Sequence, residues 1–346
     1  MDGAAWPQVR EDLASTRKSA AAFLDNLEGA SRSMGPREWA TRWISISAAH
    51  ESLGDTNRTL GYRNEAASAW LCALTTWEVA KRLLNLDSSD DEEVAARIDA
   101  TVWKFHSLEQ KIQHVKIECY DHYEIAALYL SGRSANTPAV ICISGDGETA
   151  TMLLGRLLPV VVDRGISVLV VTHDEVSRRQ RGESDMLLSA CLDYLSARSD
   201  VDARRIGVYG DGISAALATD FAASDRRVAA AVCDGGLWNW ARMTASINWL
   251  ATAAKEPNEK MMSAYRSRCL RQLKCPALVV AGGRGIVSLS EAIELERDVE
   301  GTGPVDLQLP IPRLARAPVA QVENFVTSDD RIFSWLIDKL QSHPAL

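Results

Sequence analysis

The sequence lacks any apolar run long enough to cross a membrane. No window approaches the roughly 18 continuous apolar residues that a spanning helix needs. The first residues, MDGAAWPQVREDLAS, also show no basic segment followed by an apolar one. Pairs of the Cys-x-x-Cys type are absent, and the seven cysteines lie mostly within apolar runs. We therefore expect a cytoplasmic protein with reduced, structural cysteines and no membrane contact.

Clustered positive charge is missing as well. The chain has 38 Lys and Arg against 46 Asp and Glu, and the acidic residues are spread along it, for a net charge of −8. A protein that follows a phosphate backbone needs a basic face, so we expect no nucleic acid partner. Histidines and carboxylates do not occur at metal-ligand spacing, and no Lys-containing phosphate loop is present. We therefore expect neither a metal nor a cofactor.

The first third of the chain has a helical pattern. From about residue 11 to residue 110, apolar residues recur at spacings of three and four. This spacing predicts antiparallel helices with aromatic faces, one with Trp39 and Trp43 and another with Trp70 and Trp77. The acidic run at 87–93 predicts a loop whose carboxylates favour the start of the next helix. We expect an all-helical domain over residues 1–110.

From residue 111 onward the pattern changes to strands. Two alternating segments within residues 112–130 predict an antiparallel hairpin. Five apolar segments separated by helix-length stretches then follow, at 139–144, 167–172, 205–210, 228–233 and 276–281. Such strands predict a mostly parallel sheet buried on both faces, and thus an α/β domain over residues 111–346. The loops that start at Ser144, His173, Gly210, Asp234 and Gly282 should face one crevice.

These features resemble the α/β-hydrolase superfamily, and within it the group with an N-terminal helical cap typified by 2,6-dihydroxypseudooxynicotine hydrolase. The matching segments are residues 39–51, GYRNEAASAW at 61–70, AVICISGDG at 139–147 and RIGVYG at 205–210. The resemblance implies an α/β-hydrolase fold with a helical cap, and pairing of two copies through that cap. His50, within the cap signature Ala49-His50-Glu51, becomes a candidate for substrate binding.

The resemblance also implies a Ser-Asp-His triad, and this sequence departs from it at each position. The nucleophile should stand two residues after the last glycine of the RIGVYG strand, which is Gly212. The acid should follow the strand at 276–281, where Gly285 stands instead. The histidine should precede the final helix, but the segment 314–323 has none.

A second register remains open for the nucleophile. It takes Gly212-Ile213-Ser214-Ala215-Ala216 as the turn, makes Ser214 the nucleophile, and requires the strand to end two residues later. Without an imidazole in the usual place, no group of suitable pKa stands ready to activate that serine.

Backbone groups of the hydrolase apparatus remain. The amide of Ile213 and those of the loop Gly145-Asp146-Gly147 predict an oxyanion hole at a helix N-terminus. Such a hole stabilises an enolate as well as a tetrahedral intermediate. Gly212 also leaves room for a substrate to approach the backbone.

Four ionisable side chains at strand ends are candidates for acid or base catalysis: Asp146, Asp211, Asp234 and His173. Each aspartate also has a structural interpretation. Asp146 can shape a turn, and Asp211 and Asp234 can cap the helices that follow them. Asp234 gains weight because the resembled hydrolase has an acidic residue after this strand.

Three tryptophans, Trp238, Trp240 and Trp249, follow Asp234 closely. They are either core residues or an aromatic roof over the crevice that suits a planar ligand. The sequence thus favours a non-hydrolytic enzyme acting on an aromatic or polyketide-like small molecule, by cyclisation, carbon–carbon bond formation or isomerisation through an enolate. The alternatives are a carbon–carbon or ester hydrolase, using Ser214 or no covalent intermediate, and a catalytically silent binding protein.

Overall fold

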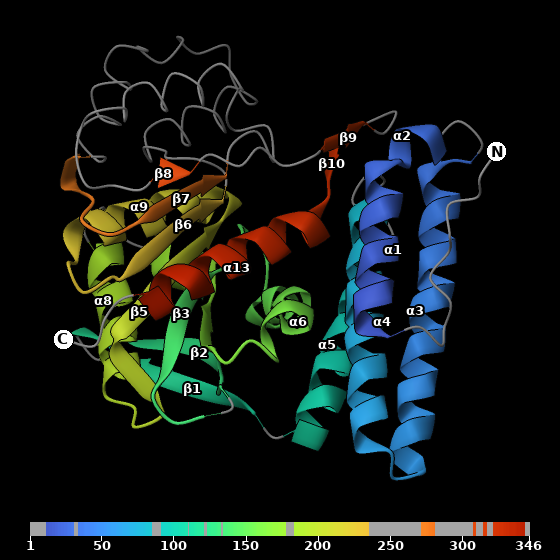
Figure 1. Cartoon of the computed structure of the whole chain (residues 1–346), viewed down its shortest axis with the longest axis horizontal. Coiled ribbons are helices and arrows are strands. Elements are labelled where there is room, and N and C mark those ends of the chain that lie inside the picture. Colours follow the sequence, from blue (N-terminus) through green and yellow to red (C-terminus); the bar gives the residue numbers. More distant parts are fainter. Residues whose placement is uncertain are drawn as a thin grey trace. The chain divides into compact units, whose positions relative to one another are not determined.

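The computed structural model describes residues 12–30, 34–84, 91–109, 111–120, 123–132, 134–177, 183–234, 271–280, 307–308, 314–316 and 321–342. The chain divides into two compact units (Figure 1). Unit 1 comprises Met1–Gln113, Thr151–Arg164 and Pro312–Arg331, and unit 2 comprises His114–Ala150, Gly165–Ile311 and Ile332–Leu346. The sequence predicts the change from helices to strands at residue 111, and the first segment of unit 1 ends at Gln113. Two later segments, Thr151–Arg164 and Pro312–Arg331, also belong to unit 1.

Unit 1 is mainly helical, as the residue spacing predicts. Its helices are α1 (Leu13–Asp25), α2 (Leu27–Ala30), α3 (Pro36–Thr59), α4 (Arg63–Leu84), α5 (Asp91–Glu109) and α6 (Ala150–Val161). All of α6 except its first residue belongs to unit 1. Helix α1 begins where the Asp12 carboxylate accepts a hydrogen bond from the Ser15 amide at 2.8 Å. Of the helices that the structure describes, none is long and apolar enough to span a membrane.

Aromatic side chains and glycines let these helices pack closely. The ring centroid of Phe23 in α1 lies 5.2 Å from that of Trp39 and 5.1 Å from that of Trp43, both in α3. Between α3 and α4, a Cβ at Gly54 would overlap the Trp70 indole, so only glycine permits this approach. The tryptophans predicted to form aromatic faces are all buried, with at most 7% of each exposed.

Charged side chains are buried in unit 1 as well. Arg82 of α4 donates to Glu78 at 2.8 Å, and Arg156 of α6 lies 3.4 Å from Asp329. Asp329 belongs to helix α13 (Phe325–Ser342), whose first residues are in this unit. Burial raises the pKa of Asp329 to about 6, against the attraction of nearby arginines. The Arg156–Asp329 pair joins α6 to the start of α13, and removing either partner would leave a buried charge uncompensated.

Unit 2 is built on one sheet with the strand order β1-β2-β4-β3-β5-β6-β7-β8 among the described residues. The strands are β1 (Ile112–Glu118), β2 (Glu124–Leu130), β3 (Thr137–Ile143), β4 (Ser167–Val171), β5 (Val201–Asp211), β6 (Ala230–Asp234), β7 (Ala277–Val280) and β8 (Leu307–Gln308). Strand β2 is antiparallel to β4, and the pairs from β4 to β8 are parallel. A short antiparallel pair, β9 (Leu314–Arg316) and β10 (Gln321–Glu323), belongs to unit 1.

The second half of β5, residues 206–211, is buried on both faces, which the continuous apolar pattern there predicts. Ile206 and Val208 pack in the core that includes α8 (Glu183–Ser196) and α9 (Ala215–Ser224). The next residue, Tyr209, points to the other face, and its ring centroid lies 5.8 Å from that of Phe333, in the part of α13 that belongs to unit 2. The sheet therefore lies between α8 and α9 on one face and α13 on the other (Figure 1).

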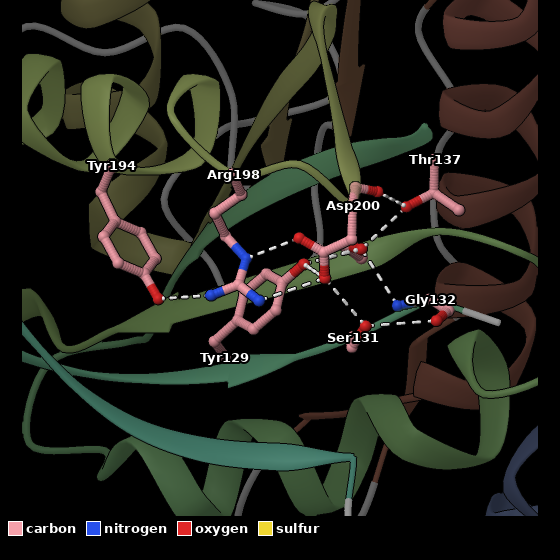
Figure 2. Close-up of polar contacts among 8 residues, drawn as sticks. Tyr129, Ser131, Gly132, Thr137, Tyr194, Arg198 and Asp200 are labelled. Carbon is pink, nitrogen blue, oxygen red and sulfur yellow. Dashed lines mark hydrogen bonds and ion pairs between the residues drawn. The ribbon is translucent and has the colours of Figure 1, made fainter. Parts of the chain in front are cut away.

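A polar cluster joins strands at the edge of the sheet where β5 begins (Figure 2). The Arg198 guanidinium donates to both carboxylate oxygens of Asp200, at 2.8 and 3.1 Å, and lies 3.8 Å from the ring centroid of Tyr129. Asp200 also accepts hydrogen bonds from Tyr129 and Ser131, at 2.9 and 3.0 Å. Burial acts to raise the pKa of Asp200, but these donors outweigh it and bring the pKa to about 2.

We expect the substitution Asp200→Asn to destabilise unit 2 by about 1–3 kcal/mol, because it removes a charge-assisted pair with Arg198. The lowered pKa means that Asp200 stabilises the fold above its unfolded pKa of about 3.9 and loses this effect as the pH falls toward 2. Urea unfolding at pH 7 and at pH 3 measures both effects. Glu124→Gln, which breaks the exposed pair with Lys116, is the control and should cost less than about 1 kcal/mol. Equal effects of the two variants would contradict the role given to Asp200.

Candidate active site

A sharp turn connects β5 to α9. Gly212 has a φ of +56°, in the left-handed region that other residues adopt only with strain. It opens a single 3-10 turn, Gly212–Ser214, which leads directly into α9. The turn folds back on the strand so tightly that a Cβ at Gly210 would overlap the carbonyl oxygen of Ser214. Glycine is therefore required at Gly210 and strongly favoured at Gly212.

Ser214 lies at the base of this turn and is fully buried. Its hydroxyl donates a hydrogen bond to the carbonyl oxygen of Ser144 at 2.6 Å. Its Oγ atom also lies 2.8 Å from Nδ1 of His173. His173 is the first residue of the short helix α7 (His173–Ser177) and is 4% exposed. The sequence pattern placed His173 in a loop, whereas the structure places it at the start of a helical turn.

Ser144 connects the same groups from the other side. It follows the last residue of β3, and its hydroxyl donates to the carbonyl oxygen of Glu148 at 2.8 Å. The same hydroxyl oxygen accepts a hydrogen bond from the His173 amide at 3.2 Å. Ser144, His173 and Ser214 thus bring together the carboxyl ends of the adjacent strands β3, β4 and β5.

The surroundings of His173 favour its neutral form. Burial lowers the pKa of His173 below its usual value, while the negative charges of Asp146 and Asp174 act in the opposite direction. Both carboxylates are exposed, so solvent weakens their effect. A neutral imidazole near pH 7 is able to accept a proton.

Two backbone amides of the loop after β3 form hydrogen bonds within the loop. Gly147 has a φ of +69°, and the Glu148 amide donates to the carbonyl oxygen of Gly145 at 3.2 Å. The Gly145 amide donates to the Glu148 carboxylate at 3.3 Å. Sequence reasoning assigned Gly145 to the oxyanion hole and missed both Ser144 and Glu148. A Glu three residues after a glycine and just before a helix is a capping pattern that could have indicated this contact.

Of the other predicted site residues, some lie within the described residues and some do not. Asp211, the last residue of β5, is fully buried and precedes the turn without a side-chain bond to the amides of that turn. Asp234 ends β6 and pairs in register with Asp211, so both lie at the same edge of the sheet. Trp238, Trp240, Trp249 and Gly285 lie outside the described residues.

His50 belongs to unit 1 rather than to this cluster. It lies on α3 and is fully buried, and neither ring nitrogen has a hydrogen-bond partner among the described residues. Burial lowers the pKa of His50 to about 4, so its ring is neutral at pH 7. In the described part of the chain, no group of three His, Cys, Asp or Glu side chains could hold a metal ion.

Comparison with known proteins identifies the architecture. Neither a protein-family model nor a curated protein sequence matches the chain. Among solved structures, the chain is similar to 2,6-dihydroxypseudooxynicotine hydrolase, with 18% identity and a TM-score of 0.62 over 94% of this chain and 97% of that one. It is also similar to Pyrococcus horikoshii acylaminoacyl peptidase, with 13% identity and a TM-score of 0.51 over 70% of this chain and 45% of that one. A prolyl endopeptidase matches with 17% identity and a TM-score of 0.50 over 66% and 38%.

The chain has the α/β-hydrolase fold. Enzymes with this fold present the nucleophile on a strained strand-to-helix turn, between small residues two positions before and after it. The residue at that turn here is Gly212, with Gly210 before it and Ser214 after it. Gly212 brings no side chain to this turn, Ile213 follows it, and Ser214 is the last residue of the turn.

We expect Gly212→Ala to lower the free energy of unfolding by about 1–2 kcal/mol, because a Cβ is strained at a φ of +56°. Chemical denaturation measures the loss. Gly29→Ala is the matched control, since Gly29 lies within α2 with open space around its Cβ position. That variant should be neutral or slightly stabilising. A Gly212→Ala protein as stable as the wild type would contradict the strained turn.

We expect His50 to make the fold sensitive to acid. Because its folded pKa of about 4 lies below an unfolded value near 6.5, the unfolded chain binds the proton first as the pH falls. Stability from His50 is complete above about pH 6.5 and is lost toward pH 4, by about 2–3 kcal/mol. His50→Leu should remove this part of the pH dependence, which urea unfolding at pH 7 and pH 5 would detect. An unchanged difference between the two pH values would contradict the assignment.

Proposed function

We propose that this protein is a non-hydrolytic enzyme that catalyses cyclisation, intramolecular carbon–carbon bond formation or isomerisation through an enolate. Gly212 carries the proposal, because a glycine stands at the turn where hydrolases of this fold present a nucleophile. A turn without an attacking atom still offers amides at a helix N-terminus. It also leaves space for a substrate directly over the backbone.

His173 acts as the acid and base of this reaction. Its imidazole is buried, has a lowered pKa, and lies at the carboxyl edge of the sheet together with Ser144 and Ser214. It removes a proton from the carbon next to a substrate carbonyl. The electron pair of the broken C–H bond moves into the carbonyl group and forms an enolate. The amide of Ile213 and the amides of Asp146 and Gly147 stabilise the oxygen of this enolate.

The second half of the reaction returns the proton. In a cyclisation, the enolate carbon attacks a second carbonyl carbon of the same molecule, and the new alkoxide oxygen takes the proton from the imidazolium. In an isomerisation, the proton returns to another carbon. Atoms and electrons balance in both cases without a cofactor. The proposed substrate is an aromatic or polyketide-like ketone, in keeping with the three tryptophans at 238, 240 and 249.

Ester or carbon–carbon bond hydrolysis through Ser214 is the second candidate. The 2.8 Å contact between Ser214 Oγ and His173 Nδ1 favours it. Against it, Ser214 is fully buried, and its hydroxyl donates to the Ser144 carbonyl rather than to the imidazole. A serine becomes a strong nucleophile when its proton passes to a base.

We expect the protein to exchange the α-hydrogens of an aryl-substituted ketone for deuterium without cleaving esters. Proton NMR of phenylacetone in D₂O, with and without protein, measures the exchange, and p-nitrophenyl acetate reports ester hydrolysis. His173→Gln should reduce the exchange about 10²-fold or more, because it removes the base. Ser189→Ala, which changes a serine bonded to Asp225, is the control and should behave as the wild type.

A fluorophosphonate ester, which reacts with activated serines, decides between the two candidates. The proposal predicts no adduct on Ser214 by mass spectrometry, with an authentic serine hydrolase labelled under the same conditions. An adduct on Ser214, together with ester hydrolysis that needs His173, would overturn the proposal in favour of the second candidate.

A further inference from the structure

We infer that helix α8 and the end of the β1–β2 hairpin form a second binding site, which takes a basic peptide segment of a partner protein. The site is a groove of about 1030 Å³ within unit 2. The described residues that line it do not include Ser144, His173 or Ser214, so the groove is separate from the candidate active site. The inference does not depend on the proposed function.

Three segments of unit 2 form the walls of the groove. They are residues 118–120 and 123 at the end of the β1–β2 hairpin, residues of α8 between 183 and 193, and residues 224–227 at and after the end of α9. A volume near the upper end of the range for small-ligand pockets gives room for several residues of a peptide.

Two large apolar side chains are exposed in this groove. Tyr120 at the end of the hairpin is 79% exposed, and Met186 on α8 is 49% exposed. They are two of the four large hydrophobic side chains that are exposed in the described part of the chain. Aromatic residues and methionine are enriched in protein interfaces, and the flexible methionine side chain adapts to different partners. The groove therefore suits a partner that brings apolar side chains of its own.

The groove also carries negative charge. Five carboxylates line it against two arginines, which leaves a net charge of −3. The carboxylates are those of Glu118, Glu183, Asp185, Asp193 and Asp225. Complementary charge selects partners and speeds their encounter, so the favoured partner is basic.

One end of the groove already holds a guanidinium group from this chain. Arg227 donates to the Asp193 carboxylate and to both oxygens of the Asp225 carboxylate. The hydrogen bond from Arg227 is the main reason that the pKa of Asp225 lies below its usual value. Asp193 and Asp225 thus have their cation within the groove itself.

Glu118 and Glu183 lack such a cation among the described residues. Neither side chain forms a hydrogen bond or ion pair with another described residue, and Oε2 of Glu183 is shielded from water as well. An acidic residue at the start of α8 stabilises the helix dipole, which accounts for Glu183 in part. The dipole does not account for Glu118, which ends β1.

An arginine or lysine side chain from a partner satisfies these groups together. Its charge pairs with the carboxylates of Glu118 and Glu183, and its planar or ammonium head stacks on the exposed ring of Tyr120. An apolar neighbour in the same peptide contacts Met186. Each contact involves a side chain that lines the groove.

A metal ion fits the groove less well. In the part of the chain that the structure describes, no group of three His, Cys, Asp or Glu side chains could hold one. The carboxylates of the groove therefore do not converge on a single small cation. Basic side chains spaced along a flexible peptide can pair with carboxylates that lie apart.

A peptide titration followed by NMR tests the inference. The probe is an acetylated hexapeptide of two arginines, one leucine and three glycines, and the comparison peptide has glutamates in place of the arginines. We expect saturable shifts of the backbone amides of α8 and of the β1–β2 hairpin with the basic peptide only. Raising the NaCl concentration from about 0.05 M to 0.5 M should weaken this binding, because salt screens exposed charges.

Substitutions in the groove locate the binding. Glu118→Gln and Glu183→Gln should each weaken it about two- to fivefold, as expected for an exposed ion pair. Tyr120→Ala should weaken it by a similar factor, because the stacking on the ring is lost. Glu124→Gln is the matched control: Glu124 lies on the same hairpin, pairs with Lys116 and does not line the groove, so binding should be unchanged.

Three results would overturn the inference. The first is the absence of saturable shifts with the basic peptide, and the second is equal binding of the basic and acidic peptides. The third is self-association of the protein that Glu118→Gln and Glu183→Gln abolish in sedimentation experiments, which would show that a second copy of this chain covers the groove. All of these measurements are made without a substrate, so the ketone exchange assay and the peptide titration can fail independently.

Discussion

The hydrogen bond between His173 Nδ1 and Ser214 Oγ, and the one that Ser214 donates to the Ser144 carbonyl oxygen, are the contacts on which the candidate site depends. They join the ends of three adjacent parallel strands, where ligands bind in open α/β sheets. They also use the only proton of the Ser214 hydroxyl. Because Gly212 brings no side chain to the turn, the proposed function assigns acid and base catalysis to the His173 imidazole.

Much of the fold could be predicted from the sequence, because apolar periodicity follows directly from how each element is buried. The tryptophan faces of α3 and α4 and the continuous apolar strands have the structure that their spacing predicts. The sharp turn at Gly210 and Gly212 could also be deduced, because a sharp turn after a buried strand needs small residues.

The contacts of the site could not be deduced in the same way. Ser214 and Ser144 are 70 residues apart, and Ser214 and His173 are 41 apart. Whether their side chains meet depends on the register of β3, β4 and β5, and on the direction of the side chains that follow these strands. Neither leaves a local sequence pattern. The Gly145 amide was assigned to an oxyanion hole, but Glu148 folds back onto it. Short-range capping thus competes with catalytic use of the same backbone group.

A shared fold does not carry a shared reaction, and the similarity to hydrolases and peptidases at 13–18% identity establishes the architecture alone. The proposed chemistry rests on the residues at the turn. Neutron diffraction from crystals grown in D₂O would test the account most directly, because it locates individual deuterons. We predict that the deuteron on Ser214 Oγ is directed at the Ser144 carbonyl oxygen. A deuteron of Ser214 directed at a bare Nδ1 of His173 would contradict the account and indicate an activated serine.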